Sequence, residues 1–132
     1  MVGSIKKVVI DASVILARLL PDEKASKEIG DLYDEFLEKK VDFVAPNLLS
    51  YEVANALRSA VRQKRITEGL AEEMLSLFLA LPIEFEEISF VETLRLAIEK
   101  KLSGYDASYV WLAKEKGIKL VSLDKRLQNE EE

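Results

Sequence analysis

The chain alternates short apolar segments, rich in β-branched residues, with longer segments whose apolar residues recur at helical spacing. Such short segments are typical of buried parallel strands, and the spacing of the longer ones predicts helices. The expected strands are 6–11, 42–45, 83–88 and 118–123, and the expected helices are 13–20, 24–40, 48–64, 68–81, 91–102 and 106–116. This alternation predicts a three-layer α/β/α fold around a central parallel sheet of about four strands. We assign no element after 118–123 and expect the acidic end to fray.

Size and composition limit the kinds of site that the chain can carry. Its 132 residues, 48% hydrophobic and 33% charged, are expected to form one globular domain over 1–132. Because cysteine and histidine are absent, the usual zinc sites and histidine-based catalysis are excluded, so a metal would be bound by oxygen, which favours Mg²⁺ or Mn²⁺. No apolar run could span a bilayer or act as a signal peptide, so we expect a cytoplasmic protein without membrane contact.

Four acidic residues are predicted to meet at one edge of this sheet. Asp11 ends the first strand, and Asp124 follows the last one. Glu52 lies in the first turns of the helix after the second strand, and Asp106 begins the helix that precedes the last strand. Strand carboxyl ends and the starts of the following helices share one edge, where open parallel sheets bind ligands. Asp42, at the start of its strand, falls on the opposite edge.

Each of these acids also has a purely structural explanation. Asp11 and Asp106 could be helix N-caps, Asp106 could instead be a first-turn acid facing the helix dipole, and Asp124 could be a turn residue. Glu52 is harder to explain, because it shares a helix side with Leu49, where an unpaired carboxylate is costly. Four separate structural roles leave the shared edge unexplained, whereas a metal site accounts for it.

The sequence resembles the PIN domain family, and more narrowly the toxin subunit of VapBC-type toxin–antitoxin pairs. The resemblance depends on four segments spread over nearly the whole chain: "VVIDASVIL", "LLSYEVANALR", "YDASYVWLAKEKG" and "LVSLDKRL". It implies a Mg²⁺- or Mn²⁺-dependent endoribonuclease that acts on RNA, binds a cognate antitoxin and forms a homodimer. The alternative is a catalytically silent PIN fold that only binds RNA or protein.

The resemblance also implies roles for single residues. Its acidic positions are matched by Asp11, Glu52, Asp106 and Asp124. We expect Asp11 and Asp106 to bind the metal directly, and the other two acids to hold metal-bound water or a second ion. A further set would orient these ligands: Ser13, Asn55, Ser108 and Ser122, the last at a position where threonine is common.

A stripe of arginines is the candidate for contact with RNA. Arg58, Arg62 and Arg65 are spaced to lie on one side of the Glu52 helix. The stripe is either a solvated face or a track for phosphates. Because the formal charge of the chain is −5, nucleic acid would have to be bound by a local stripe and not by the whole surface. Lys125 and Arg126, beside Asp124, form a smaller candidate.

The segment 68–81 is the candidate for contact with a protein partner, because its apolar residues occupy more than one helix face. It is either fully buried or a dimer or antitoxin contact. The residues concerned are Leu70, Met74, Leu75, Leu77, Phe78, Leu79 and Leu81.

Overall fold

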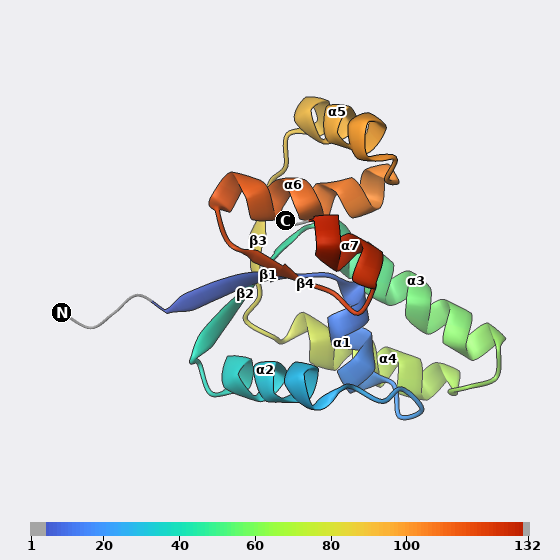
Figure 1. Ribbon diagram of the computed structural model, residues 1–132. Helices are drawn as coiled ribbons and strands as arrows, with labels where there is room; N and C mark the ends of the chain where they lie inside the picture. The colour runs from blue at the N-terminus through green and yellow to red at the C-terminus, as the bar shows by residue number, and fades with distance from the viewer. Residues whose placement is uncertain (1–4, 131–132) are drawn as a thin grey trace.

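A four-stranded parallel sheet forms the centre of the protein (Figure 1). The computed structural model describes residues 5–130. The strands are β1 (Lys6–Ile10), β2 (Val41–Pro46), β3 (Glu84–Glu86) and β4 (Lys119–Val121), in the spatial order β3-β2-β1-β4. The predicted parallel α/β fold is thus confirmed. Asp42 lies at the start of β2, in register with Lys7 of β1, on the edge opposite to the strand ends.

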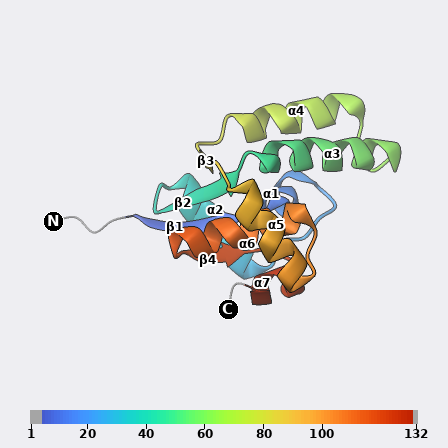
Figure 2. The same ribbon diagram turned by 90° about the horizontal axis from the view of Figure 1, so that it is seen from above.

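Helices cover both faces of the sheet (Figures 1 and 2). One face carries α1 (Ala12–Leu19), α2 (Lys27–Leu37), α3 (Leu48–Arg62) and α4 (Glu68–Leu79), and the other carries α5 (Phe90–Lys100), α6 (Gly104–Lys116) and α7 (Lys125–Glu130). α5 packs on α6 and is therefore outermost on its side (Figure 1). None of the helices within residues 5–130 is long and apolar enough to cross a membrane.

Alternate side chains of the strands build two separate cores. Val8 and Ile10 of β1 face the layer of α1 to α4. In this layer the ring of Phe36 stacks on that of Phe43, with centroids 4.1 Å apart. Val9, between Val8 and Ile10, faces α6 instead. Because both faces are covered, Val8, Val9 and Ile10 of β1 are all buried, and a continuous apolar run of this kind predicts a strand.

Local polar residues set the starts of several helices. Ser26, Thr67, Ser89 and Ser103 each accept, through the side-chain hydroxyl, a hydrogen bond from the backbone N–H three residues further on. Gly117 ends α6 in the left-handed region, with φ of 65°. Because capping residues of this kind can be recognised in the sequence, most predicted helix boundaries lie close to the observed ones.

The segment after β4, for which no element was predicted, is helical in the structure. It forms α7, because the side chain of Leu127 is buried in the core beside α6. In addition, Oδ1 of Asp124 accepts hydrogen bonds from the backbone N–H groups of Arg126 and Leu127. Residues 131–132, the last of the acidic end, lie outside the described residues. A single buried leucine among polar residues gives too weak a pattern to predict a helix.

Core packing explains most of the apolar excess of α4. Met74 and Phe78 are buried against the core, and Leu70, Leu75 and Leu81 pack against the same cluster. Leu77 and Leu79 remain 58% and 63% exposed. The predicted partner surface on this helix is thereby reduced to two exposed leucines.

Candidate active site

Asp11 lies between the end of β1 and the start of α1, with only 8% of its surface exposed. Its carboxylate accepts hydrogen bonds from the backbone N–H and hydroxyl of Ser13 and from the hydroxyl of Ser122. Burial raises the pKa of Asp11, and these hydrogen bonds partly offset the rise. Asp11 is therefore the N-cap of α1, as one alternative proposed, and also a buried carboxylate at the strand end.

Glu52 projects from the first half of α3 and is half-buried. The hydroxyl of Tyr109, on α6, donates a hydrogen bond to its Oε1. Burial raises the pKa of Glu52, the Tyr109 hydrogen bond lowers it, and the negative charges of Asp106 and Asp11 raise it further. Asp106 and Asp11 are therefore close enough to Glu52 for their charges to repel its own.

Asp106 lies in the first turn of α6, but it is not the N-cap. Ser103 is the cap, and its hydroxyl accepts the backbone N–H of Asp106. The N-cap alternative is therefore wrong for this residue. Oδ2 of Asp106 accepts a hydrogen bond from Nη2 of Arg126 on α7, at 3.3 Å. The positive charge of Arg126 partly neutralises the negative charge of Asp106 in this ion pair.

Asp124 is joined to Asp11 through a serine. Its backbone N–H donates to the hydroxyl of Ser122, which in turn donates to Oδ2 of Asp11. Ser13 connects the same two segments, because its hydroxyl accepts the backbone N–H of Leu123. Two serines thus link the ends of β1 and β4 by hydrogen bonds. The carboxylate of Asp124 caps α7 and is exposed.

Two other predicted orienting residues take different positions. Ser108 is buried, and its hydroxyl donates to the backbone carbonyl of Tyr105 within α6. Asn55 is exposed and lines a groove together with Glu52. Tyr109, which holds Glu52, was not predicted. Its spacing of three residues from Asp106 on one helix could have identified it, because residues three apart share a helix face.

The groove beside Glu52, here called the acid groove, runs between α1 and α3 with a volume of about 430 Å³. Apolar side chains of α1 form one wall, and α3 forms the other. At its far end are Glu23 and Arg65. The lining comprises Ala12, Leu16, Leu20, Glu23, Glu52, Asn55, Ala56, Ser59 and Arg65.

The three arginines of the predicted stripe do not lie together. α3 ends at Arg62, so Arg65 leaves the helix and forms ion pairs with Asp22 and Glu23 at 2.7 and 3.2 Å. Arg65 lines the acid groove. Arg58 and Arg62 instead line a separate, largely apolar groove between α3 and α4. Arg65 therefore shares a groove with Glu52, whereas Arg58 and Arg62 line a different one.

The acid cluster has the donor chemistry that a divalent ion requires. Its ligands are carboxylate oxygens, which Mg²⁺ and Mn²⁺ prefer. Within residues 5–130, no three acidic side chains lie close enough as they stand to hold one ion between them. Burial is the main reason that the pKa of Glu52 is raised, and the negative charges of Asp106 and Asp11 add to the rise. A bound cation would relieve this repulsion. The residues that could hold an ion are Asp11, Glu52, Asp106 and Asp124.

Comparison with known proteins covers nearly the whole chain. The PIN domain family matches residues 8–130. The Pyrobaculum aerophilum protein named Ribonuclease VapC3 is 30% identical over 125 residues, 92% of each chain. Exonuclease VapC9 of the same organism is 32% identical over 108 residues, 82% of this chain and 81% of that protein. The crystal structure of PAE2754 from Pyrobaculum aerophilum has a TM-score of 0.74 at 28% identity, and the match covers 96% of this chain and 87% of that chain.

Proposed function

This chain belongs to the PIN domain family, and we propose that it is a divalent-metal-dependent endoribonuclease, the toxin of a type II toxin–antitoxin pair that acts in the cytoplasm. The names of its VapC relatives support ribonuclease activity. Within the chain itself, the observation that carries the proposal is the gathering of carboxylates at the carboxyl edge of the sheet. A module that only bound RNA or protein would not need this costly cluster.

Each residue of the cluster has a defined part in this proposal. Asp11 and Asp106 would bind the ion, and Glu52 and Asp124 would hold water or a second ion. When bound, Mg²⁺ or Mn²⁺ would supply a water of lowered pKa and would neutralise charge on the phosphodiester. Ser13 and Ser122 fix the carboxylate of Asp11, and the Tyr109 hydroxyl fixes that of Glu52.

We expect the purified protein to cut a circular single-stranded RNA in the presence of Mg²⁺ or Mn²⁺. A circle has no ends, so the substrate separates endonuclease from exonuclease action, a distinction that the names of the relatives leave open. The measurement is conversion of the circle to linear RNA on a denaturing gel. EDTA should stop the reaction, and an excess of Mn²⁺ should restore it. Binding without cleavage, by protein free of any antitoxin, would instead favour the silent binding module.

Arg58, Arg62 and Arg65 are proposed to contact phosphates of the RNA, and we expect Arg65 to contribute most because it lines the acid groove. Arg65→Gln should lower RNA affinity and flatten the slope of log K against log salt by about one for each phosphate that is no longer neutralised. The matched control is the double variant Arg58→Gln/Arg62→Gln, whose side chains line the other groove. Fluorescence anisotropy over a salt series gives both slopes. Unchanged slopes in both variants would show that none of the three arginines contacts a phosphate of the RNA.

A further inference from the structure

Arg126 of α7 is the basic residue that the fold brings to the acid cluster. Its backbone N–H donates to Oδ1 of Asp124, and its Nη2 donates to Oδ2 of Asp106 at 3.3 Å. Within residues 5–130, no other lysine or arginine forms an ion pair with one of the four acids. In this part of the chain the cluster therefore has a single cationic partner.

The backbone of Arg126 is held in place independently of its guanidinium. The next residue, Leu127, is buried in the core beside α6, next to which α7 lies (Figure 1). The side-chain amide of Gln128 bonds to β4 and its end. Its Oε1 accepts the backbone N–H of Ser122 at 2.8 Å, and its Nε2 donates to the backbone carbonyl of Leu120. The docking of α7 therefore does not depend on the ion pair of Arg126.

The guanidinium of Arg126, in contrast, is held loosely. The side chain is 60% exposed, and among the residues that the structure describes the guanidinium has one hydrogen bond, to Asp106. Arg65 shows the difference, because two of its nitrogens bond to Asp22 at 2.7 Å and its side chain is 31% exposed. An exposed ion pair with a single bond contributes little to stability. The other N–H donors of Arg126 are therefore available to another anion.

Asp106 cannot hold Arg126 and a divalent ion equally well. Two cations at one carboxylate repel each other, since the energy between charges rises as their separation falls. A cation bound by Asp106 would therefore weaken the contact of this carboxylate with Arg126. Conversely, Arg126 has to give up part of its contact before such an ion can bind. The ion pair thus makes Arg126 a competitor of the metal for Asp106.

The phosphodiester of RNA is an anion that Arg126 is well placed to receive. A phosphate that approaches the acid cluster meets negative carboxylates, so it needs a positive charge beside them. The guanidinium offers planar, paired N–H donors that fit two phosphate oxygens at once. Because its backbone is fixed at Asp124, the side chain can exchange a carboxylate for a phosphate at the same edge of the sheet without any movement of α7.

We propose that Arg126 has two successive roles at the acid cluster. Without metal it is the counter-ion of Asp106, and with metal bound its guanidinium binds a phosphate of the RNA at the same edge of the sheet. The first role requires only that a divalent ion binds at the cluster, whereas the second rests on the proposed ribonuclease function. The two roles predict opposite effects of one substitution, because loss of the guanidinium helps the metal to bind and removes a contact with RNA.

Arg126→Gln should bind Mn²⁺ about two- to fivefold more tightly than the wild type, because no exposed ion pair has to be broken first. Isothermal titration calorimetry without RNA measures this affinity. The matched control is Arg18→Gln, which removes the same charge and breaks an ion pair of similar length, 3.2 Å to Asp34, between α1 and α2. This control should bind Mn²⁺ like the wild type. Equal or weaker binding by Arg126→Gln would overturn the counter-ion role.

Cleavage of the circular RNA should change in the opposite direction. At saturating Mn²⁺ we expect kcat/KM of Arg126→Gln to be at least about tenfold below that of the wild type, since a hydrogen bond between two charged groups is lost. Arg126→Lys keeps the charge but not the paired donors, and it should lie between the two. Arg18→Gln should cut at the wild-type rate. The melting temperature of Arg126→Gln should match that of the wild type, because Leu127 and Gln128 still dock α7.

The combined results separate this proposal from the proposed function. If the wild type and Arg126→Gln cleave RNA equally well, the phosphate role is wrong and the ribonuclease function stands. If the wild type binds Mn²⁺ but cuts no RNA, the function is wrong and the phosphate role with it, whereas tighter Mn²⁺ binding by Arg126→Gln would still support the counter-ion role. If Arg126→Gln lost cleavage, Mn²⁺ affinity and melting temperature together, the residue would be structural and both roles would be wrong.

Discussion

Replacing Asp106 with asparagine should lower RNA cleavage by at least about 100-fold while the protein stays folded. Loss of a residue that only orients a metal ligand costs about 10–100-fold in affinity or activity, so loss of a proposed ligand should reach or exceed that range. The fold should survive because Ser103, not Asp106, caps α6. Rates are measured with the circular RNA under conditions in which the wild type is saturated with Mn²⁺.

Metal binding by the same variant can be measured without any activity. A ligand that binds only the folded state raises the melting temperature by mass action, so Mn²⁺ should stabilise the wild type and have little effect on Asp106→Asn. Without metal, asparagine removes the repulsion between Asp106 and Glu52 but also the exposed ion pair with Arg126. These effects oppose each other, and the free energy of unfolding should change by no more than about 1 kcal/mol.

Asp42→Asn is the control for this experiment. Asp42 lies on the opposite edge of the sheet, in register with Lys7, so its replacement changes the net charge equally but should leave both cleavage and the Mn²⁺ effect at wild-type level. If Asp106→Asn cleaved RNA like the wild type, the proposed role of Asp106 in a metal-dependent mechanism would be wrong. If millimolar Mn²⁺ did not change the melting temperature of the wild type, the proposal of a metal site would be wrong.

The parallel sheet and the position of the acids could be predicted because both follow from local patterns. The second half of β1 is buried on both faces, so Val8, Val9 and Ile10 form a continuous apolar run, and the helices between the strands force parallel connections. Once the strands are parallel, the strand ends at Asp11 and Asp124 must share an edge. Neither step requires knowledge of a side-chain contact, which is why both succeed.

The surroundings of the acids depend on contacts between distant residues, and sequence spacing does not reveal these. The helical spacing of Arg58, Arg62 and Arg65 holds only while the helix continues, and α3 ends at Arg62. Arg65 then pairs with Asp22, 43 residues away. The exposed apolar side chains of α5 were not predicted for a related reason, since an apolar residue such as Leu94 looks the same in sequence whether it faces α6 or solvent.

The last helix provides the sharpest structural test, since no element was predicted from the sequence where the structure has α7. Leu127→Ala should lower the free energy of unfolding by about 2–5 kcal/mol, because truncating a fully buried leucine removes its burial and leaves a cavity. Leu127 is 1% exposed and packs in the core beside α6. Urea denaturation followed by circular dichroism measures the change.

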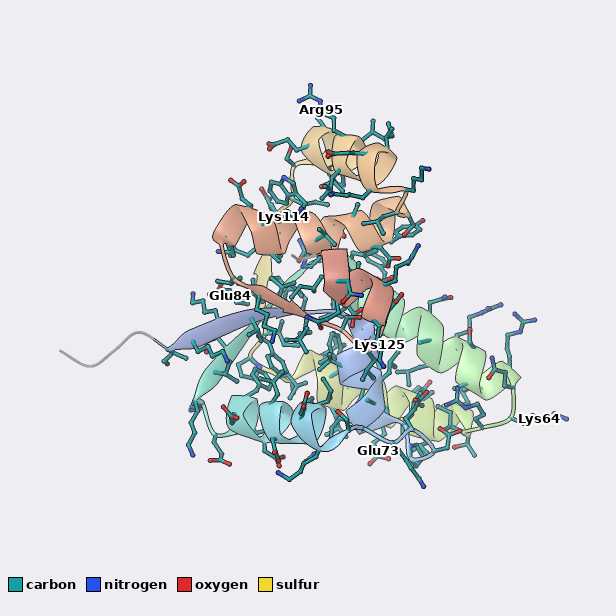
Figure 3. The ribbon with its side chains drawn as sticks, in the orientation of Figure 1. Lys64, Glu73, Glu84, Arg95, Lys114 and Lys125 are labelled. Atoms are coloured by element: carbon teal, nitrogen blue, oxygen red, sulfur yellow. The ribbon has the colours of Figure 1, made fainter. Side chains whose placement is uncertain are left out.

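Lys125→Ala is the matched control on the same helix, because Lys125 is exposed (Figure 3) and its loss should change stability by no more than about 0.5 kcal/mol. If Leu127→Ala were equally harmless, α7 would not be docked in solution. Asp124 and Arg126 would then be free to leave the acid cluster, since their hydrogen bonds to α7 and to Asp106 hold only while the helix is in place. A large loss for Leu127→Ala and none for Lys125→Ala would instead show that the burial of one leucine docks α7, whose backbone N–H groups bind the carboxylate of Asp124.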